Sequence, residues 1–432
     1  MSAFQLLIYG CSGYIGRLTA ERAALHPGSV VLAGRSRKKV AALADKLDLP
    51  YRVFSLDNPE DIDANIRDVK VVLNLAGPFA FTTPPLIHSC IRVQTHYLDV
   101  TTEPSVFHLL FETLSPAIRN AGIVCIPGVG FELVPTDVLA AMLHHHIPTA
   151  THLDLSFAFS DQSRPLAASP GATKTYLSTL ADPQHCSARI DGRMTPVRHF
   201  YKTRRVAFPT AGSALVGFVP WADSLTAYYT TGIPNIDTFV PVDPSMVRSA
   251  LWSFFLVRAL LRHFPPFQWL LFLLVDIFYS RPPSDADRKG VRIDVWGEAR
   301  DERTGEGVRG SLQTMEGYGF ASCAALEAAR ELIERADEGG AVSSATGEEN
   351  ENRSGEDRIR PGTYTPSRAF SPNFIFTIPN TTLYTFIRFK MSPAASRLAS
   401  VGLASSSSSS IAAVKSKSTT LIPPVIQGTG WS

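Results

Sequence analysis

Short apolar runs alternate with amphipathic or polar segments along the first third of the chain. The apolar runs that predict buried strands cover residues 6–9, 29–33, 51–54, 69–75, 96–100 and 123–126. Helical segments are predicted between them, chiefly at residues 17–25, 58–67, 84–93, 103–120 and 134–146. A regular strand–helix alternation is typical of a parallel sheet covered on both faces. Residues 1–150 are therefore predicted to form an α/β domain with a Rossmann-type doubly wound sheet.

From about Thr151 the pattern changes, which predicts a second, mixed α+β domain over residues 151–336 plus 363–380. Residues 152–159 alternate in polarity, as in a half-buried strand of an antiparallel sheet. Strand-like pieces follow between Arg189 and Thr231, later strands are expected at 291–298 and 310–318, and residues 321–335 predict a closing helix. Residues 337–362 are acidic and rich in Gly and Ser, and residues 391–432 are of low complexity, so both are predicted to be disordered.

Residues 251–279 form an apolar segment rich in Leu, Phe and Trp. Arginines, a histidine, an aspartate and Pro265–Pro266 interrupt it, and neither half reaches the ~20 apolar residues that a spanning helix needs. One interpretation is two short helices that lie on or dip into a membrane or lipid-droplet surface. The other is a helical hairpin packed on the second domain or at a homodimer interface.

Composition narrows the function classes. The formal net charge of +2 over 432 residues gives no electrostatic case for nucleic-acid binding. The five cysteines are scattered without zinc-ligand or redox spacing, which favours reduced thiols. Three consecutive histidines, 144–146, cannot converge from one helix on a single ion, so no metal is expected. Because a strand begins near Phe4, we expect an intracellular protein, cytoplasmic or peripheral to a membrane, rather than a secreted one.

Three glycines at residues 10, 13 and 16 follow the first strand and precede a helix. Glycine allows the tight turn and the close approach of a pyrophosphate, and the helix start offers free N–H groups to the phosphates. An ordinary turn is the alternative. The residues predicted to bind the cofactor here are Gly10, Ser12, Gly13, Tyr14, Ile15 and Gly16.

The end of the second strand indicates which nicotinamide cofactor is bound. An NAD enzyme usually has Asp or Glu there to hold the ribose 2′-hydroxyl. This chain instead has Arg35, Ser36 and Arg37, which suit a 2′-phosphate. NADP(H) is therefore the predicted cofactor, with Asp57 beside the adenine. A solvated, basic start of a helix is the alternative.

The reaction centre is predicted at the carboxyl ends of the middle strands. The fourth strand ends in the turn Ala76, Gly77, Pro78 and Phe79, where we expect the nicotinamide. Tyr97, Asp99 and Glu103 cluster at the end of the next strand, and Tyr97 or Asp99 is a candidate proton donor. A structural role for this Tyr and Asp is the alternative.

Several motifs together resemble the saccharopine dehydrogenase-like oxidoreductases, and most closely the subgroup related to trans-acting enoyl reductases. The matching pieces are Gly10–Gly16, Leu32-Ala-Gly-Arg35, Asn74-Leu-Ala-Gly-Pro-Phe79, Thr95-His-Tyr-Leu-Asp99, Pro127-Gly-Val-Gly-Phe131 and Val134-Pro-Thr-Asp137. The resemblance implies a Rossmann NADP-binding domain, hydride transfer, and a second domain for substrate and oligomer contacts.

The resemblance leaves three functions open. The first is an NADP(H)-dependent reductase of a hydrophobic lipid- or polyketide-type substrate, in lipid or glycolipid metabolism; relatives in animals are associated with lipid droplets. The second is a saccharopine-type reductase of amino-acid metabolism, although no set of arginines for a dicarboxylic amino acid is evident. The third is a catalytically silent nucleotide-binding protein at a membrane or lipid droplet.

Overall fold

Seven parallel strands form the first of two sheets in the computed structural model of the chain. The structure describes residues 4–25, 30–161, 169–181, 186–198, 200–243, 259–278, 282–338, 359–384, 386–390 and 420–422. The strand order in the first sheet is β15-β6-β5-β4-β1-β2-β3. These strands are β1 (Phe4–Tyr9), β2 (Val30–Gly34), β3 (Tyr51–Val53), β4 (Val69–Asn74), β5 (His96–Asp99), β6 (Val124–Ile126) and β15 (Gly362–Thr363). The strand order reverses between β1 and β4, as it does in doubly wound sheets, and the predicted Rossmann-type sheet is confirmed.

Helices connect these strands and cover the sheet. They are α1 (Tyr14–Ala23), α2 (Arg37–Leu47), α3 (Pro59–Ile66), α4 (Phe79–Val93), α5 (Pro104–His108), α6 (Ser115–Asn120) and α7 (Val134–His146), with a π-helical segment at Leu109–Thr113. Asn58 starts α3 as a side-chain cap, accepting hydrogen bonds from the backbone of Glu60 and Asp61. The strand–helix order expected from the apolar pattern is therefore present throughout this part of the chain.

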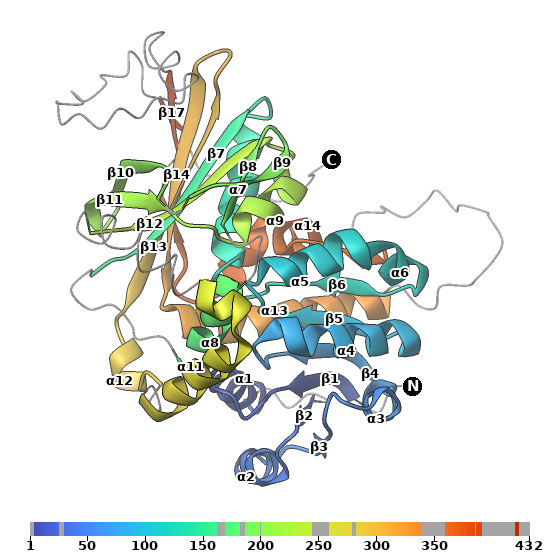
Figure 1. Cartoon of the computed structure of the whole chain (residues 1–432). Helices are drawn as coiled ribbons and strands as arrows, with labels where there is room; N and C mark the ends of the chain where they lie inside the picture. Colours follow the sequence, from blue (N-terminus) through green and yellow to red (C-terminus); the bar gives the residue numbers. More distant parts are fainter. Residues whose placement is uncertain are drawn as a thin grey trace, which may run out of the picture.

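The second sheet is mixed and larger. Its main order is β10-β11-β12-β7-β13-β14-β17-β18, with β8, β9 and β16 paired beside it. The strands are β7 (His152–Phe159), β8 (Ser187–Ile190), β9 (Arg193–Pro196), β10 (Thr203–Phe208), β11 (Gly212–Phe218), β12 (Asn235–Pro241), β13 (Arg292–Asp301), β14 (Glu306–Met315), β16 (Thr382–Leu383), β17 (Phe386–Lys390) and β18 (Thr420–Ile422). Figure 1 shows this sheet in the upper part of the view and the first sheet in the lower part.

The remaining helices lie along the second half of the chain. They are α8 (Pro170–Ala181), α9 (Asp223–Thr231), α11 (Pro265–Phe278), α12 (Asp285–Arg288), α13 (Gly317–Glu338) and α14 (Pro366–Phe370), with a 3-10 helix at Pro372–Thr377. Within the apolar segment 251–279, α11 is described and packs against α8 (Figure 1). None of the helices in the described part of the chain is both long and apolar enough to cross a bilayer.

Three predicted elements differ from the structure for identifiable reasons. Helix α4 begins at Phe79 rather than Pro84, because a carboxylate from a distant part of the chain caps its first turn. The single helix predicted over 103–120 is instead two helices and a π-helical segment, and α6 restarts with Pro116 near its beginning. Residues 223–231 form α9 rather than a strand, and Gly232 ends this helix in the left-handed conformation with a φ of 71°.

The second half of the chain holds further differences. Strand β7 lies between a parallel and an antiparallel neighbour and is buried on both faces over its first half, so it is not a half-buried antiparallel strand. Strand β18 lies inside the predicted disordered tail and pairs with β17. Most of that tail, residues 339–358 of the predicted acidic insertion, and residues 251–258 of the apolar segment lie outside the described residues.

The predicted division into two domains stays a prediction, but two elements cross it. Helix α13, expected to close the second domain, packs mainly against α1 and the strands of the first sheet. Strand β15 extends the first sheet beside β6. One continuous apolar core joins both sheets: it includes Leu6 and Leu73 from the first sheet, Leu139 from α7, and Val295 and Leu312 from the second.

Candidate functional site

The glycine turn after β1 is packed too closely against its neighbours for a side chain at Gly10 or Gly16. Gly10 adopts a φ of +82°, and a Cβ placed there would lie 2.7 Å from the backbone nitrogen of Ala76. A Cβ on Gly16 would collide with the carbonyl oxygen of Gly10. Any other residue at either position would push the turn, α1 and the end of β4 apart, so the close approach of these three segments depends on glycine.

The start of α1 is open to an anion. Gly13 occupies the N-cap position, is exposed, and no side chain caps the free N–H groups of the first turn. Such groups and the positive end of the helix dipole bind phosphate well. Ser12 is exposed beside Gly13, and Ile15 packs on the core.

Tyr14 links this turn to the second half of the chain. Its ring packs edge-on against Tyr318, with the centroids 4.9 Å apart, and its hydroxyl donates to the carbonyl oxygen of Pro283 at 2.5 Å. The Tyr14 side chain, which was predicted to contact the cofactor, is thus held by contacts with Tyr318 and Pro283.

The basic group predicted to select the cofactor lies at the carboxyl end of β2. Arg35 and Arg37 are exposed, and neither makes an ion pair with a described residue. Ser36 is the N-cap residue of α2, and its side chain makes no capping hydrogen bond. No carboxylate stands at the end of β2, so two cations and a hydroxyl are available to a ligand at this edge of the sheet.

Asp57 and Arg35 come together next to the hydroxyl of Tyr9. Burial raises the pKa of Tyr9 to about 12, Arg35 acts against this shift and Asp57 adds to it. Asp57 itself is exposed, just beyond β3. The predicted adenine side of the site therefore joins residues from the ends of three strands.

The turn after β4 is held by Glu103. One carboxylate oxygen accepts a hydrogen bond from the backbone N–H of Phe79 and the other from that of Ala80, both at 2.7 Å. Pro78, joined to Gly77 by a cis peptide bond, immediately precedes these two donors. Glu103 thus caps α4 from outside the helix and fixes the turn that was predicted to face the nicotinamide.

Tyr97 and Asp99 lie in one buried hydrogen-bonded network. The Tyr97 hydroxyl donates to Asp99 Oδ2 at 2.9 Å and accepts from Asn74 Nδ2 at 3.1 Å. The other oxygen of Asp99 accepts from the backbone of Thr101 and Gly128, each at 3.0 Å. The three predicted catalytic residues therefore cluster as expected, although both Tyr97 and Asp99 are fully buried. That one of them donates a proton stays a prediction.

Burial perturbs the acids of this cluster. Loss of solvation raises the pKa of Glu103 to about 7, against the hydrogen bonds from Phe79 and Ala80. Loss of solvation likewise raises the pKa of Asp99 to about 6. A carboxyl group that titrates near neutral pH can both give and accept a proton under physiological conditions.

Two features of this region were not predicted as site residues. Asn74 accepts from the backbone of Ala76 at 3.0 Å while it donates to Tyr97, so it joins the turn to the buried network. Asp223, at the first position of α9, lines a pocket beside Trp221. Asn74 could have been identified from the sequence, because it belongs to the Asn74–Phe79 motif given above. Asp223 could not, because an acidic residue at the start of a helix is usually explained by its interaction with the helix dipole.

Comparisons with known proteins agree with this geometry. Residues 6–126 match the family model described as the saccharopine dehydrogenase NADP binding domain. A saccharopine dehydrogenase-like oxidoreductase of Bos taurus is 28% identical over 154 residues, which cover 31% of this chain and 36% of that protein. A trans-acting enoyl reductase of Mycobacterium leprae is 29% identical over 151 residues, covering 33% and 36% of the two chains. The matched region thus spans little more than a third of these relatives.

A solved structure shares the wider fold. Saccharopine dehydrogenase (L-Glu forming) from Saccharomyces cerevisiae superposes with a TM-score of 0.54 and 14% sequence identity, over 90% of this chain and 100% of that one. At this identity the similarity concerns the arrangement of both sheets alone. The resemblance inferred from the glycine turn, the basic strand end and the later motifs is thereby confirmed for the first part of the chain: residues 6–126 are similar to the NADP-binding domain of saccharopine dehydrogenases.

Proposed function

We propose that the protein is an NADP(H)-dependent oxidoreductase that reduces a hydrophobic, lipid- or polyketide-type substrate. The observation that carries the cofactor assignment is the uncapped start of α1 beside a strand end with two exposed arginines that form no ion pair with a described residue. The names of the enoyl reductase relatives support the substrate class.

The described residues fit the cofactor in three places. The exposed Gly13 and the free N–H groups of α1 would hold the pyrophosphate, and Arg35 and Arg37 the 2′-phosphate. The turn from Ala76 to Phe79 would lie against the nicotinamide. When bound, NADPH supplies a hydride for an electron-poor C=C or C=N carbon of the substrate.

We assign the proton that completes such a reduction to Glu103. Its carboxyl group binds the turn that we propose faces the nicotinamide, and its pKa of about 7 suits proton transfer near neutrality. Tyr97 and Asp99 act as positioning residues, because their hydrogen bonds join the ends of β4, β5 and β6.

An apolar surface on α11 supports a lipid-like substrate and contact with a membrane or lipid droplet. Five large apolar side chains on this helix are 49–75% exposed: Trp269, Leu270, Leu273, Ile277 and Phe278. Lys174 of α8 pairs with Asp276 of α11 at 2.6 Å, and one turn of α8 also reaches the cofactor turn, where Thr175 lies beside Gly77. A substrate held at this surface would therefore be near the reaction centre.

The cofactor assignment is tested with an Arg35→Ala, Arg37→Ala double variant. Each charge-assisted hydrogen bond to a phosphate contributes about 1.5–3 kcal/mol, so NADPH should bind at least about tenfold more weakly while NADH binding is unchanged. Fluorescence titration of both nucleotides measures this. Lys46→Ala removes a cation from the far end of the same helix and should change neither affinity. An unchanged preference for NADPH in the double variant contradicts the assignment.

Substrate panels separate the three candidate functions. Saturable NADPH oxidation with a long-chain enoyl thioester supports the proposed reductase. Turnover with an amino acid and a semialdehyde instead supports a saccharopine-type reductase. Tight NADPH binding without turnover on either panel supports a silent nucleotide-binding protein.

A further inference from the structure

Helix α8 lies against both turns of the proposed cofactor site. The backbone N–H of Ser169, just before α8, donates to the Tyr318 hydroxyl at 2.5 Å, and the Tyr318 ring packs on Tyr14 at the start of α1. Six residues further on, which is about 9 Å along a helix, the Thr175 hydroxyl oxygen would lie 3.0 Å from a Cβ placed on Gly77. The second half of the chain therefore reaches the turns after β1 and β4 through α8.

Thr175 also contacts the proposed proton donor. Its hydroxyl donates a hydrogen bond to the Glu103 carboxylate. This carboxylate already accepts the backbone N–H groups of Phe79 and Ala80, both at 2.7 Å. Those two donors belong to one helix start, whereas Thr175 comes from a different element. Hydrogen bonds from two elements restrict the rotation of the Glu103 carboxyl group.

The packing of α8 fixes where Thr175 lies. The Ser169 hydroxyl accepts a hydrogen bond from the backbone N–H of Ala172 at 3.2 Å in the first turn of α8. Lys174, next to Thr175, forms an ion pair with Asp276 of α11 at 2.6 Å. The helix is thus held at its start and in its second turn, so the Thr175 hydroxyl is presented to the turn after β4 at a defined position.

Burial and a neighbouring acid act against the charged form of Glu103. Loss of solvation raises its pKa to about 7 and Asp99, at the end of β5, adds to the rise, whereas the hydrogen-bond donors lower the pKa. Helix α4 has no acid in its first turn, and His108 at the end of α5 pairs with Glu112 at 2.8 Å. The donors therefore keep the ionised form of Glu103 accessible near neutral pH.

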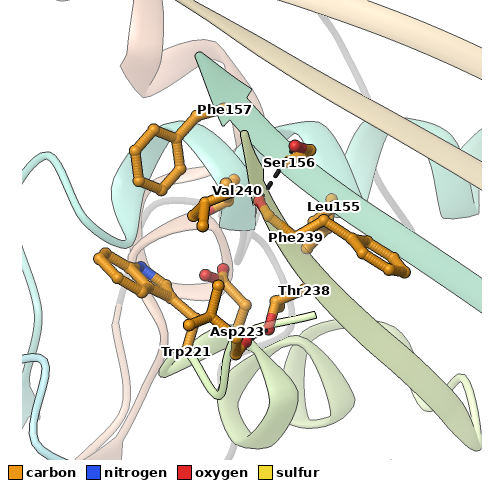
Figure 2. Close-up of a pocket in the computed structure, with 10 residues that line it drawn as sticks. Leu155, Ser156, Phe157, Trp221, Asp223, Thr238, Phe239 and Val240 are labelled. Atoms are coloured by element: carbon orange, nitrogen blue, oxygen red, sulfur yellow. Dashed lines mark hydrogen bonds between the residues drawn. The ribbon is translucent and has the colours of Figure 1, made fainter. Parts of the chain in front are cut away.

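Glu132 is a further acid near this point, on the loop after β6. Its carboxyl group accepts a hydrogen bond from the Thr102 hydroxyl, and burial raises its pKa. Its backbone carbonyl oxygen accepts from the indole N–H of Trp221 at 2.7 Å, and Figure 2 shows the Trp221 ring beside the Asp223 carboxylate. Asp223 in turn accepts from Thr136. Both carboxyl groups thus have donors that do not come from α8.

We propose that Thr175 is a positioning residue of the reaction centre, whose hydroxyl donates to Glu103 and holds this carboxyl group against the turn from Gly77 to Phe79. The inference rests on the proposed function, in which Glu103 gives the proton that completes the reduction. Once Glu103 has given its proton to the substrate, the Thr175 hydroxyl stabilises the carboxylate that remains. The second half of the chain thereby takes part in a step that the first sheet would otherwise carry out alone.

The first test compares Thr175→Val with Thr175→Ser in the pH profile of kcat/KM with NADPH and a long-chain enoyl thioester. Valine keeps the shape of threonine without its hydroxyl, so ionised Glu103 loses a donor and its pKa should rise. The limb near pH 7 should move to higher pH by about 1 pH unit. Serine keeps the donor and should restore the limb to its wild-type position. An unmoved limb in Thr175→Val would overturn the proposal.

Thr173→Val is the matched control in the same helix. The Thr173 hydroxyl donates to the backbone carbonyl oxygen of Ser169 at 3.1 Å, within α8 itself. This variant should leave the limb where it is in the wild type. A limb that moves equally in Thr173→Val and Thr175→Val would overturn the proposal, because the effect would then come from the helix as a whole.

A double-mutant cycle on unfolding needs no turnover. Urea denaturation at pH 6 and pH 8 compares the wild type, Thr175→Val, Glu103→Gln and the double variant. Losing the Thr175 donor should lower the folded-to-unfolded ratio about fivefold more at pH 8, where Glu103 is ionised, than at pH 6. This difference should vanish in the Glu103→Gln background.

The cycle also separates this inference from the proposed function. An effect of Thr175→Val that is equal at both pH values, or that persists in the Glu103→Gln background, would overturn the role of Thr175. If the cycle shows the expected coupling while no enoyl thioester is reduced, the contact between Thr175 and Glu103 is supported and the proposed substrate class fails.

Discussion

Glu103 illustrates how one side chain can organise a site from a distance in sequence. Its two oxygens each accept one backbone N–H at the start of α4, and its own N–H donates to the Thr101 hydroxyl at 3.2 Å. Glu103 therefore joins the segment that follows β5 to the start of α4, which follows β4. Because it is buried, its proton affinity is raised to the range where it can exchange a proton with a substrate.

Glu103→Gln should affect stability and catalysis differently. Glutamine has a single acceptor oxygen, so one of the two N–H groups at the start of α4 loses its partner, which should destabilise the protein by about 1–3 kcal/mol. Urea denaturation measures this loss. If Glu103 donates the proton, the limb of the kcat/KM profile near pH 7 should also disappear with the enoyl substrate.

The control for this prediction is Glu21→Gln. Glu21 makes an exposed ion pair with Lys46, so its replacement should change the free energy of unfolding by at most about 0.5 kcal/mol. A Glu103→Gln variant with unchanged pH dependence would assign Glu103 a structural role only.

For single residues, the sequence predicted which side chains lie at the site better than it predicted how these side chains are buried and oriented. Tyr97, Asp99 and Glu103 were expected together because parallel strand ends meet at one edge, and the structure brings them together. Their burial could not be inferred, since it depends on helices that cover the sheet. Asp223 could not be found from the sequence because its burial beside Trp221 is a property of the folded chain.

The exposed face of α11 is the element whose role is most open to experiment. Large apolar side chains on one helix form an exposed patch of the kind that marks an interaction surface. If this surface docks on lipid, wild-type protein should float with vesicles of phosphatidylcholine and triacylglycerol. The Trp269→Ser, Leu273→Ser variant should float at least about tenfold less, because each buried apolar side chain contributes about 1.5–3 kcal/mol.

Sedimentation of the same two proteins separates the alternatives. Loss of a wild-type dimer in the double variant, without flotation of either protein, would support the homodimer interface instead. Ala64→Ser, on an exposed position of α3, is the matched control and should change neither result.

Elements that depend on local pattern were predictable and those that depend on long-range contacts were not. The strand and helix order of the first sheet follows from apolar periodicity, and Asn58 caps α3 as its sequence indicates. The earlier start of α4 depends on Glu103, more than twenty residues away. The return of α13 and β15 to the first sheet could not be inferred, because both follow the second sheet in sequence.

The whole molecule combines buried acids whose proton affinities are raised by folding. Loss of solvation raises the pKa of Asp99 to about 6, that of Glu103 to about 7 and that of Asp223 well above its usual value. In each case the folded state binds the proton more tightly than the unfolded chain. Histidines act in the opposite direction, since burial lowers the pKa of His96 to about 4 and also lowers the pKa of His144, His146 and His152. The contributions of these acids and histidines to the pH dependence of stability therefore oppose each other between pH 5 and 6.5.

The contribution of Glu103 to the free energy of unfolding should fall as the pH rises from 5 to 7, because its pKa is raised to about 7 in the folded protein. Each proton held by the folded but not the unfolded state changes this free energy by about 1.4 kcal/mol per pH unit. Urea denaturation at pH 5, 6 and 7 and fixed ionic strength measures the slope. Asp223→Asn and Glu103→Gln should each make the slope shallower, whereas Glu21→Gln should not. An unchanged slope in the Glu103→Gln variant would show that the carboxyl group of Glu103 is ionised in the folded protein over this range.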